Sequence, residues 1–295
     1  KYDDNVNRLM LILNKFKVQM FYPYVLMRLH DVDQNDSDEQ LISDFKKLES
    51  FIVRRKISTR GTNDYTSKCY QIIQNGIDYL CDSDFGNPDG KITDFDVKQY
   101  LSNTKDDTAK MILFCIELYR RRVPAVDVKA LEYVYTLEHI MPKKWEKNWL
   151  DVAIDDNGSI LNPSSDEGKQ FRDGAIQSIG NKTLLTGSLN SSVKNAAFSK
   201  KISGDGEHKP GYEAHTLLLI TRDIVNQARN DTVWDEKHIA SRLDSLYAEF
   251  LELWPSYLPV VNQTDDDNDA NNDPNLSQYT EEELADPVKL MNAVP

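Results

Sequence analysis

Apolar residues recur every three or four positions over much of this chain, with polar residues between them. Such spacing places the apolar residues on one face of a helix, where they can pack against a core. The first helix is predicted over residues 5–32, with a kink at Pro23 because proline interrupts helical hydrogen bonding. The same spacing predicts further helices over residues 36–56, 65–81, 95–101, 106–122, 212–229 and 234–253.

The pattern changes in the middle of the chain, between residues 128 and 203. Residues 131–137 are rich in aromatic and β-branched side chains, which is typical of a strand. Residues 183–185 predict a second short strand, and a helix is expected to follow and to run through Lys201. The sequence therefore predicts a mainly α fold, a helical scaffold in which a small ββα unit is embedded.

Four regions follow from this pattern. Residues 1–127 are predicted to form the helical scaffold, and residues 128–203 the ββα unit with an inserted loop. Residues 204–258 are expected to supply C-terminal helices that pack on the scaffold. Residues 259–295 are rich in Asp and Asn, so an acidic, disordered tail is predicted.

The charge is unevenly distributed along the chain. The formal net charge is −13, and residues 264–295 contribute −8 of it through nine acids and one lysine, which leaves −5 for the rest. Residues 181–201 contain no acid, and a positive field over a phosphate backbone is therefore possible there. The predicted DNA-binding cations are three lysines of this segment and two arginines at the end of an upstream helix: Lys182, Lys194, Lys201, Arg54 and Arg55. The two arginines have an alternative role, which is to stabilise a helix C-terminus.

The three cysteines, Cys69, Cys81 and Cys115, form no Cys-x-x-Cys pair. Their odd number and their apolar surroundings predict buried free thiols, with neither a disulfide framework nor a structural zinc site. No apolar run approaches the length of a membrane span. A reducing, cytoplasmic location is therefore expected.

Four side chains in the central region suit phosphodiester hydrolysis, which needs a base for water and ligands for a cation. His139 has the intrinsic pKa of a base near neutral pH. Glu138 and Asn190 are oxygen donors, which suit Mg²⁺ or Mn²⁺ better than zinc. Asn181 could hold the loop that carries His139 through main-chain hydrogen bonds. On one ideal helix, Asn190 would share a face with lysines that could contact a neighbouring phosphate, namely Lys194 and Lys201.

One geometric condition applies to this site. Adjacent residues of a regular strand point to opposite faces, so Glu138 and His139 would not share a site in mid-strand. They can face one cation only at a strand end or at a bulge. Pro142 makes a strand end at this point consistent with the sequence.

These residues carry a family resemblance. The segments are 138–142 (Glu-His-Ile-Met-Pro), 180–185 (Gly-Asn-x-Thr-Leu-Leu) and a third that begins at Leu189-Asn190 and continues with Asn195, Phe198 and a lysine. Together they resemble the HNH (ββα-metal) nuclease motif. More narrowly, they resemble the C-terminal nuclease domain of the GmrSD/SspE/BrxU-type modification-dependent restriction and phage-defence family. The resemblance covers most of residues 1–256.

The resemblance implies a role for each matching residue. His139 matches the general base, Asn181 the central asparagine, and Glu138 and Asn190 the metal-ligand positions. Asn195 and Lys200 match further motif positions, as additional active-site candidates. The resemblance also implies a bacterial endonuclease that nicks or cuts double-stranded DNA with a divalent cation. An N-terminal nucleotide-binding or sensor domain, which is not visible in this sequence, would be its partner.

Two functions from different classes remain open on the sequence. The first is a metal-dependent DNA endonuclease domain. The second is a catalytically inert helical module that binds DNA or a partner and retains a degenerate nuclease motif. Asn195 could likewise be an active-site contact or a helix surface residue, and each lysine by itself could be an ordinary solvated side chain.

Overall fold

Helices make up most of the structure, a computed structural model that describes residues 5–32, 38–80, 92–122, 131–149, 153–206, 209–215 and 217–257. The mainly α prediction is confirmed. The chain divides into two units, Lys1–Leu258 and Pro259–Pro295. The predicted disordered tail, residues 259–295, lies outside the described residues.

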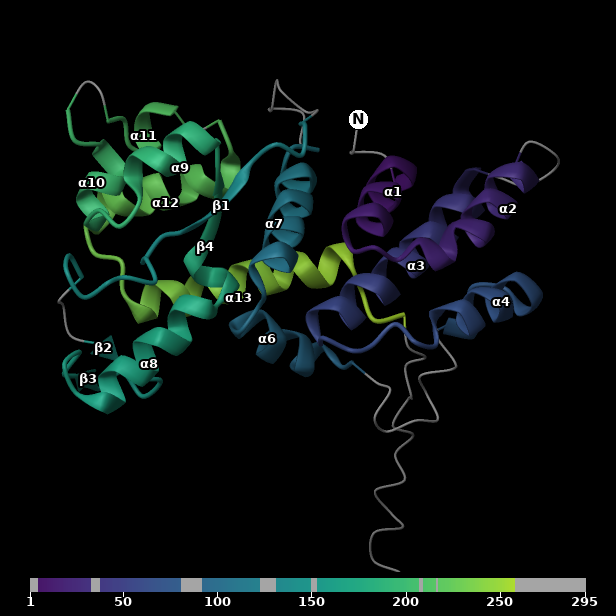
Figure 1. Ribbon diagram of the computed structural model, residues 1–295, viewed down its shortest axis with the longest axis horizontal. Coiled ribbons are helices and arrows are strands. Elements are labelled where there is room, and N and C mark those ends of the chain that lie inside the picture. Colours follow the sequence, from purple (N-terminus) through teal and green to yellow (C-terminus); the bar gives the residue numbers. More distant parts are fainter. Residues whose placement is uncertain are drawn as a thin grey trace, which may run out of the picture. The chain divides into compact units, whose positions relative to one another are not determined.

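The first part of the chain is helical throughout its described residues (Figure 1). Its elements are α1 (Asn5–Lys15), η1 (Gln19–Phe21), α2 (Tyr22–Val32), α3 (Asp38–Ile57), α4 (Tyr65–Asn75), α6 (Asp94–Ser102) and α7 (Asp106–Arg120). The single helix predicted over residues 5–32 is wrong. The chain turns at Lys17, which has a φ of 59°, whereas Pro23 lies in the first turn of α2, where proline is tolerated.

Helix α7 lies at the centre of the larger of two hydrophobic cores. Its residues from Met111 to Ile116 are all at most 1% exposed. This core combines α1 to α7 with the C-terminal end of α13 (Glu236–Leu253). Arg8 and Glu49 form a buried ion pair (2.7 Å). The same carboxylate oxygen of Glu49 accepts a hydrogen bond from the indole of Trp254 (2.7 Å), so the end of α13 is fixed between α1 and α3.

Two short strands lie between the cores. Strand β1 (Thr136–His139) pairs antiparallel with β4 (Lys182–Leu185). A second pair, β2 (Ala153–Ile154) and β3 (Ile160–Leu161), forms a separate hairpin. The strand predicted over residues 131–137 is therefore displaced. Tyr133 instead packs its ring edge-on against Phe114 (centroids 4.9 Å apart), so burial rather than strand pairing explains its apolar character.

The remaining helices are α8 (Asp166–Gln177), η2 (Ile179–Asn181), α9 (Gly187–Val193), α10 (Phe198–Ser203), α11 (Tyr212–His215), α12 (Leu219–Asn230) and α13. The helix predicted to run through Lys201 is wrong, because α9 ends at Val193 and its C-cap, Lys194, has a φ of 38°. Asn190 and Lys201 therefore belong to two helices and not to one helical face.

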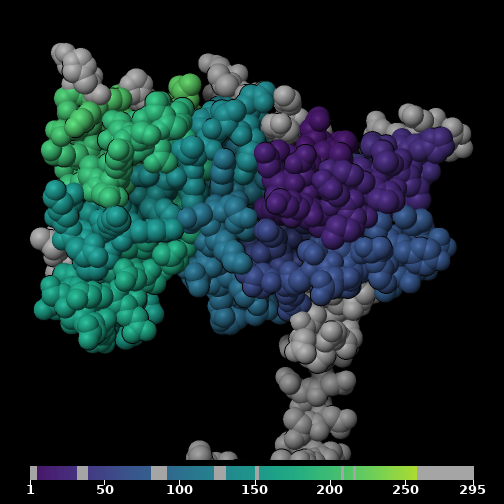
Figure 2. Space-filling model, viewed as in Figure 1, coloured from purple at the N-terminus to yellow at the C-terminus, as the bar shows by residue number. Residues whose placement is uncertain are grey.

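Helix α13 joins the two regions of the described structure. It packs against η2, α6, α7 and α8 (Figure 1). The contact with η2 is close: a Cβ on Gly180 would lie 2.1 Å from the carbonyl oxygen of Ile239, so only glycine fits there. Figure 2 shows the residues of α1 to α4 (purple and blue) on one side and those from β1 to α12 (teal to green) on the other. This packing places η2 against α13, and β4 against α7 and α12.

Candidate active site

The register of β1 and β4 decides which side chains share a face. Glu138 lies opposite Thr183, and His139 lies opposite Lys182. Residues directly opposite each other in an antiparallel pair point to the same face, and neighbours along a strand point to opposite faces. Glu138 and Thr183 are therefore on one face of the ribbon, and His139 and Lys182 are on the other.

The two hydrophobic cores confirm that the faces differ. Leu184, on the face of His139, belongs to the larger core around α7. Leu185, on the face of Glu138, belongs to the smaller core with Ile140 and Leu189. His139 is the last residue of β1, yet its pairing with Lys182 keeps the regular alternation. A shared site required a strand end or a bulge that turns Glu138 and His139 to one side. The end of β1 does not turn them to one side.

The face of His139 carries four ionisable side chains, which we call the scaffold-face cluster: Asp106, His139, Lys143 and Lys182. The carboxylate of Asp106, in the first turn of α7, lies 3.4 Å from Nε2 of His139. It also accepts hydrogen bonds from Lys143 (2.9 Å) and pairs with Lys182 (3.1 Å). Lys182 donates a further hydrogen bond to the carbonyl oxygen of Thr104. The sequence analysis did not identify Asp106 or Lys143.

His139 is neutral at neutral pH. Burial lowers its pKa to about 4, and the positive charges of Lys182 and Lys143 act in the same direction, while Asp106 partly opposes them. Its Nε2 atom is buried and has no hydrogen-bond partner among the described residues. The side chain is nevertheless 14% exposed, so part of it reaches the surface.

Asp106 is ionised. Burial by itself would raise the pKa of its carboxyl group, but hydrogen bonds from Lys143 and Lys182 hold that pKa below its usual value. The side chain is 46% exposed, and that of Lys143 is 51% exposed. The scaffold-face cluster therefore opens to solvent at Asp106 and Lys143.

Asn181 holds the turn that follows His139. Its Oδ1 accepts from the amide of Met141 (2.8 Å), and its Nδ2 donates to the carbonyl of the same residue (2.8 Å). The carbonyl of Asn181 accepts from the amide of Ile140 (2.8 Å), and Trp234 donates its indole N–H to Oδ1 (3.3 Å). These are the main-chain hydrogen bonds that the sequence suggested. Asn181 is 0% exposed, so in this structure it can act only by positioning.

The opposite face carries a closed ion pair, which we call the Glu138–Lys201 pair. The Lys201 ammonium, from α10, donates to the Glu138 carboxylate and to the carbonyl oxygen of His139 (2.8 Å). The hydroxyl of Tyr212 lies 3.4 Å from the same carboxylate oxygen. Glu138 is 6% exposed, and Lys201 and Tyr212 are 0% exposed. Burial raises the pKa of Glu138 and lowers that of Lys201, while each charge stabilises the other.

Asn190 ties α9 to β1 rather than pointing away from the fold. Its Nδ2 donates to the carbonyl of Leu137 (2.8 Å) and to the hydroxyl of Thr136 (3.1 Å). The oxygen of its carboxamide carries no hydrogen bond from the described residues. Asn195 is exposed after α9, and its main-chain carbonyl accepts a hydrogen bond from the side-chain amide of Asn148 (2.8 Å). The exposed Lys200 pairs with Asp205 (3.1 Å).

The arrangement does not fit the cation that the motif implies. The Glu138 carboxylate is already paired with an ammonium group, and His139 lies on the other face. Within the described residues, no group of three or more His, Cys, Asp or Glu side chains is placed to hold a metal ion. Glu138 and Asn190 as they lie here therefore do not form a Mg²⁺ or Mn²⁺ site.

Most of the predicted DNA-binding cations are inside the fold. Arg54 donates to the carbonyls of Trp254 and Ile92 and pairs with Asp94 (2.7 Å). Arg55 pairs with Asp64 (3.0 Å). Both arginines are at most 9% exposed. Lys182 and Lys201 are 0% exposed. Of the five predicted cations, only Lys194 is exposed. This corrects the predicted basic groove, because sequence alone does not distinguish a solvated cation from a buried one.

Comparison with known proteins identifies one family. The family model for the C-terminal domain of GmrSD restriction endonucleases matches residues 89–249, which is 161 of the 295 positions. Both the scaffold-face cluster and the Glu138–Lys201 pair lie within the match. No curated protein and no solved structure matches the chain. None of the described helices is both long enough and apolar enough to cross a membrane.

Proposed function

Because this chain belongs to the family of GmrSD restriction endonuclease C-terminal domains, we propose that it hydrolyses phosphodiester bonds of double-stranded DNA with His139 as the general base. The observation that carries this proposal is the neutral imidazole of His139 in a cluster that opens to solvent. A general base must be unprotonated at the working pH and must reach water. His139 meets the first condition through burial, and the exposed part of its side chain supports the second.

The proposed step is proton transfer coupled to attack on phosphorus. Neutral His139 takes a proton from a water molecule, and the water oxygen forms a bond to phosphorus. The bridging P–O bond on the opposite side breaks, and the departing sugar oxygen takes up a proton from solvent. Lys143 is half exposed beside His139, so its ammonium can contact a phosphate oxygen and offset the charge that develops there. Asp106 and Asn181 act as positioning residues, the first for the ring and the second for the turn after β1.

Nucleases of this family type commonly use divalent cations. The predicted HNH-type ligands, Glu138 and Asn190, would have to rearrange before they could share an ion. The Mg²⁺ or Mn²⁺ dependence implied by the motif therefore stays a prediction. Removal of divalent cations by EDTA tests it directly.

The second candidate is a catalytically inert module that binds DNA or a partner. One observation favours it, which is the closure of Glu138 by Lys201 on the face where the motif would place a cation. Plasmid relaxation by the full chain, with Mg²⁺, with Mn²⁺ and with EDTA, separates the two candidates. Nicking or linear product supports the nuclease. No product at micromolar protein, together with retained DNA binding, supports the inert module.

We further propose that this activity serves restriction of foreign, modified DNA in the bacterial cytoplasm. The family of restriction endonucleases supports this setting. A nucleotide-binding or sensor domain would then select the modification. Cleavage of matched modified and unmodified plasmids by this chain alone tests that division of labour, which predicts equal rates on the two.

A further inference from the structure

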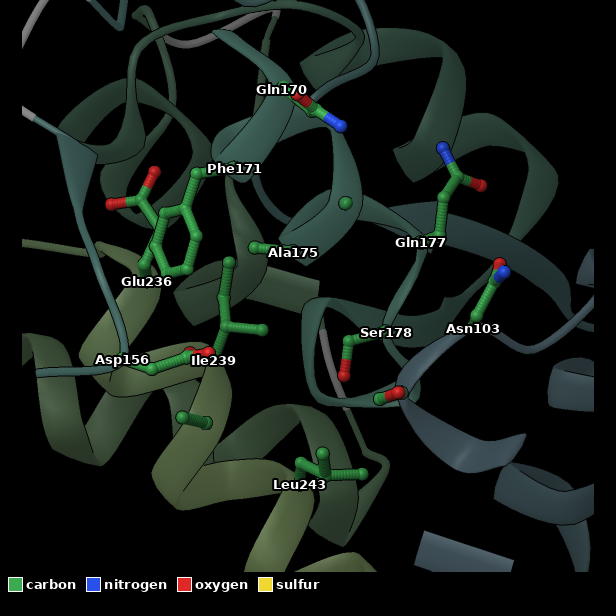
Figure 3. Close-up of a pocket in the computed structure, with 13 residues that line it drawn as sticks. Asn103, Asp156, Gln170, Phe171, Ala175, Gln177, Ser178, Glu236, Ile239 and Leu243 are labelled. Carbon is green, nitrogen blue, oxygen red and sulfur yellow. The ribbon is translucent and has the colours of Figure 1, made fainter. Parts of the chain in front are cut away.

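A cavity of about 430 Å³ lies away from both charge clusters, between the end of α6, helix α8 and helix α13 (Figure 3). Its volume is in the usual range of small-molecule sites, about 300–1,000 Å³. Neither the proposed hydrolysis step nor the core of the fold uses this space. Its lining combines three kinds of groups that point to one class of ligand.

The first kind is apolar. Phe171, Ile239 and Leu243 line the cavity. Figure 3 shows the Phe171 ring on one side, with Ile239 and Leu243 below the open space. An aromatic ring beside aliphatic side chains suits a flat, apolar ligand face.

The second kind is a set of side-chain amides. Asn103, Gln170 and Gln177 lie along the rim opposite the apolar floor (Figure 3). No hydrogen bond from the described part of the chain engages these amide groups. Each amide offers both a donor and an acceptor, so together they can read the edge of a planar polar ligand.

The third kind is carboxylate, with one buried group and one exposed group. Glu236 is 4% exposed and lines the cavity. One oxygen accepts from Arg172 (2.6 Å), whereas Oε2 is buried without a hydrogen-bond partner among the described residues. Because Oε2 has no accessible surface, a ligand in the cavity does not reach it, and the acceptor that is open to the cavity is the exposed carboxylate of Asp156.

The charge of the lining excludes a phosphate as the group that enters. Two carboxylates, Asp156 and Glu236, border the cavity, and none of the described lining residues is Lys or Arg. A negatively charged group would therefore be repelled. The ligand that fits is neutral and planar, with apolar faces and an amino group on its edge.

We propose that this cavity binds an amino-bearing nucleobase: adenine, cytosine or guanine. Carboxylates accept hydrogen bonds from the amino group of cytosine, and Asn or Gln amides pair with adenine. The assignment of this base to the DNA substrate rests on the proposed nuclease function. Proteins that bind an extrahelical base hold it by stacking and by hydrogen bonds to its edge.

The cavity is tied directly to the scaffold-face cluster. Asn103 and Gln177 both line it, and the residue after Asn103, Thr104, donates its amide to the carbonyl of Gln177 (3.3 Å). The carbonyl of the same Thr104 accepts from Lys182. One main-chain segment thus forms the cavity wall and supports the cluster around His139.

Gly174 provides a variant that fills the cavity without disturbing the fold. It lines the cavity within α8, and a Cβ added to it meets nothing within 4 Å. Gly174→Leu should therefore place its side chain in the open space while improving the helix propensity. Gln74→Leu, on the exposed face of α4, is the matched control for an added surface leucine.

The test measures nucleoside binding to the full chain by saturation-transfer NMR, with adenosine, cytidine and thymidine as probes. We expect adenosine and cytidine to bind wild type and Gln74→Leu equally. Gly174→Leu should weaken both at least tenfold, and the double variant Gln170→Ala/Gln177→Ala should weaken them too. Thymidine, which lacks an amino group, should bind more weakly. Adenosine binding that is unchanged in Gly174→Leu, or thymidine binding equal to adenosine binding, overturns the proposal.

A second arm identifies the source of the base. DNA that carries one 2-aminopurine should gain fluorescence on binding when that base leaves the stack, and Gly174→Leu should remove the gain if DNA supplies the base. If only nucleoside binding depends on Gly174, a free nucleoside is the occupant. Nucleoside binding does not require cleavage, so a failed plasmid assay overturns the nuclease function and leaves this result standing.

Discussion

The two faces of the β1–β4 ribbon carry similar charged groups in opposite situations. On one face, Asp106 and Lys143 leave about half of their side chains in solvent around a neutral His139. On the other face, Glu138 and Lys201 are closed off from water. The residues that carry this difference, Glu138 and His139, are neighbours in the chain. The comparison teaches that a motif assembled from adjacent residues can be divided by strand alternation into an open site and a buried brace.

The largest effect is expected on the open face. His139→Ala should reduce DNA cleavage by about 10²–10⁴-fold, the usual contribution of a general base. Plasmid relaxation measures the rate, and circular dichroism checks the fold. His238→Ala is the control, because His238 lies in α13 and pairs with Asp235 (2.6 Å) away from the cluster. Equal nicking by His139→Ala and wild type would show that the open face is not the site.

The next effect is expected on the closed face. Lys201→Met leaves the Glu138 carboxylate buried without its partner, which should cost about 3–5 kcal/mol of unfolding free energy. Urea unfolding measures the loss. The neighbouring Lys200 makes a surface pair with Asp205, with both side chains more than half exposed, so Lys200→Met should cost only about 0–1 kcal/mol.

A double variant sharpens the same comparison. Glu138→Gln/Lys201→Met removes both charges, and it should recover part of the stability that Lys201→Met loses. If Lys200→Met and Lys201→Met destabilise the chain equally, the Glu138–Lys201 pair is not the buried brace inferred here.

A smaller effect concerns pH on the open face. The active form of His139 is neutral, and its pKa is lowered to about 4. Protonation therefore removes activity only as the pH falls through about 4, whereas an unshifted imidazole would lose activity near 6.5. The pH profile of kcat/KM measures this limb. A limb near pH 6.5 would contradict the buried, neutral ring.

Asp106→Asn should shift the acidic limb of the pH profile to lower pH and should also lower the rate of cleavage. Asp106 raises the pKa of His139, so removing its charge lowers that pKa further. The loss of the carboxylate also loosens the orientation of the ring, for which about a tenfold to hundredfold loss of rate is expected. A variant with full activity and an unmoved limb would remove Asp106 from the positioning role.

The smallest effect is expected for the exposed cation of the cluster. Lys143→Ala should weaken DNA binding by less than about tenfold on all sequences. It should also reduce the slope of log K against log salt concentration by about one. Fluorescence anisotropy over a salt series measures both. Lys144→Ala is the matched control, since Lys144 is exposed next to it and makes no contact with the cluster. The same loss in both variants would indicate general charge rather than a positioned contact.

The sequence predicted the parts of the fold that depend on local pattern. Helical spacing identified most of the helices, and the Gly-Asn segment identified Asn181 as the residue that holds the turn after His139. The breaks at Lys17 and Lys194 were missed, because both residues adopt a positive φ without being glycine. Local propensity gives no signal for such positions.

The sequence also identified the chemistry of the candidate site, with His139 as a candidate base. It identified the main geometric difficulty as well, which is that strand alternation turns Glu138 to the opposite face. Only the tertiary structure decided how each face was used. Helix α7 brings Asp106 to His139 from 33 positions upstream, and α10 brings Lys201 over Glu138 on the other face. The physical reason is that the energy of an ion depends on its partners and on its access to water, and both are set by packing between distant segments.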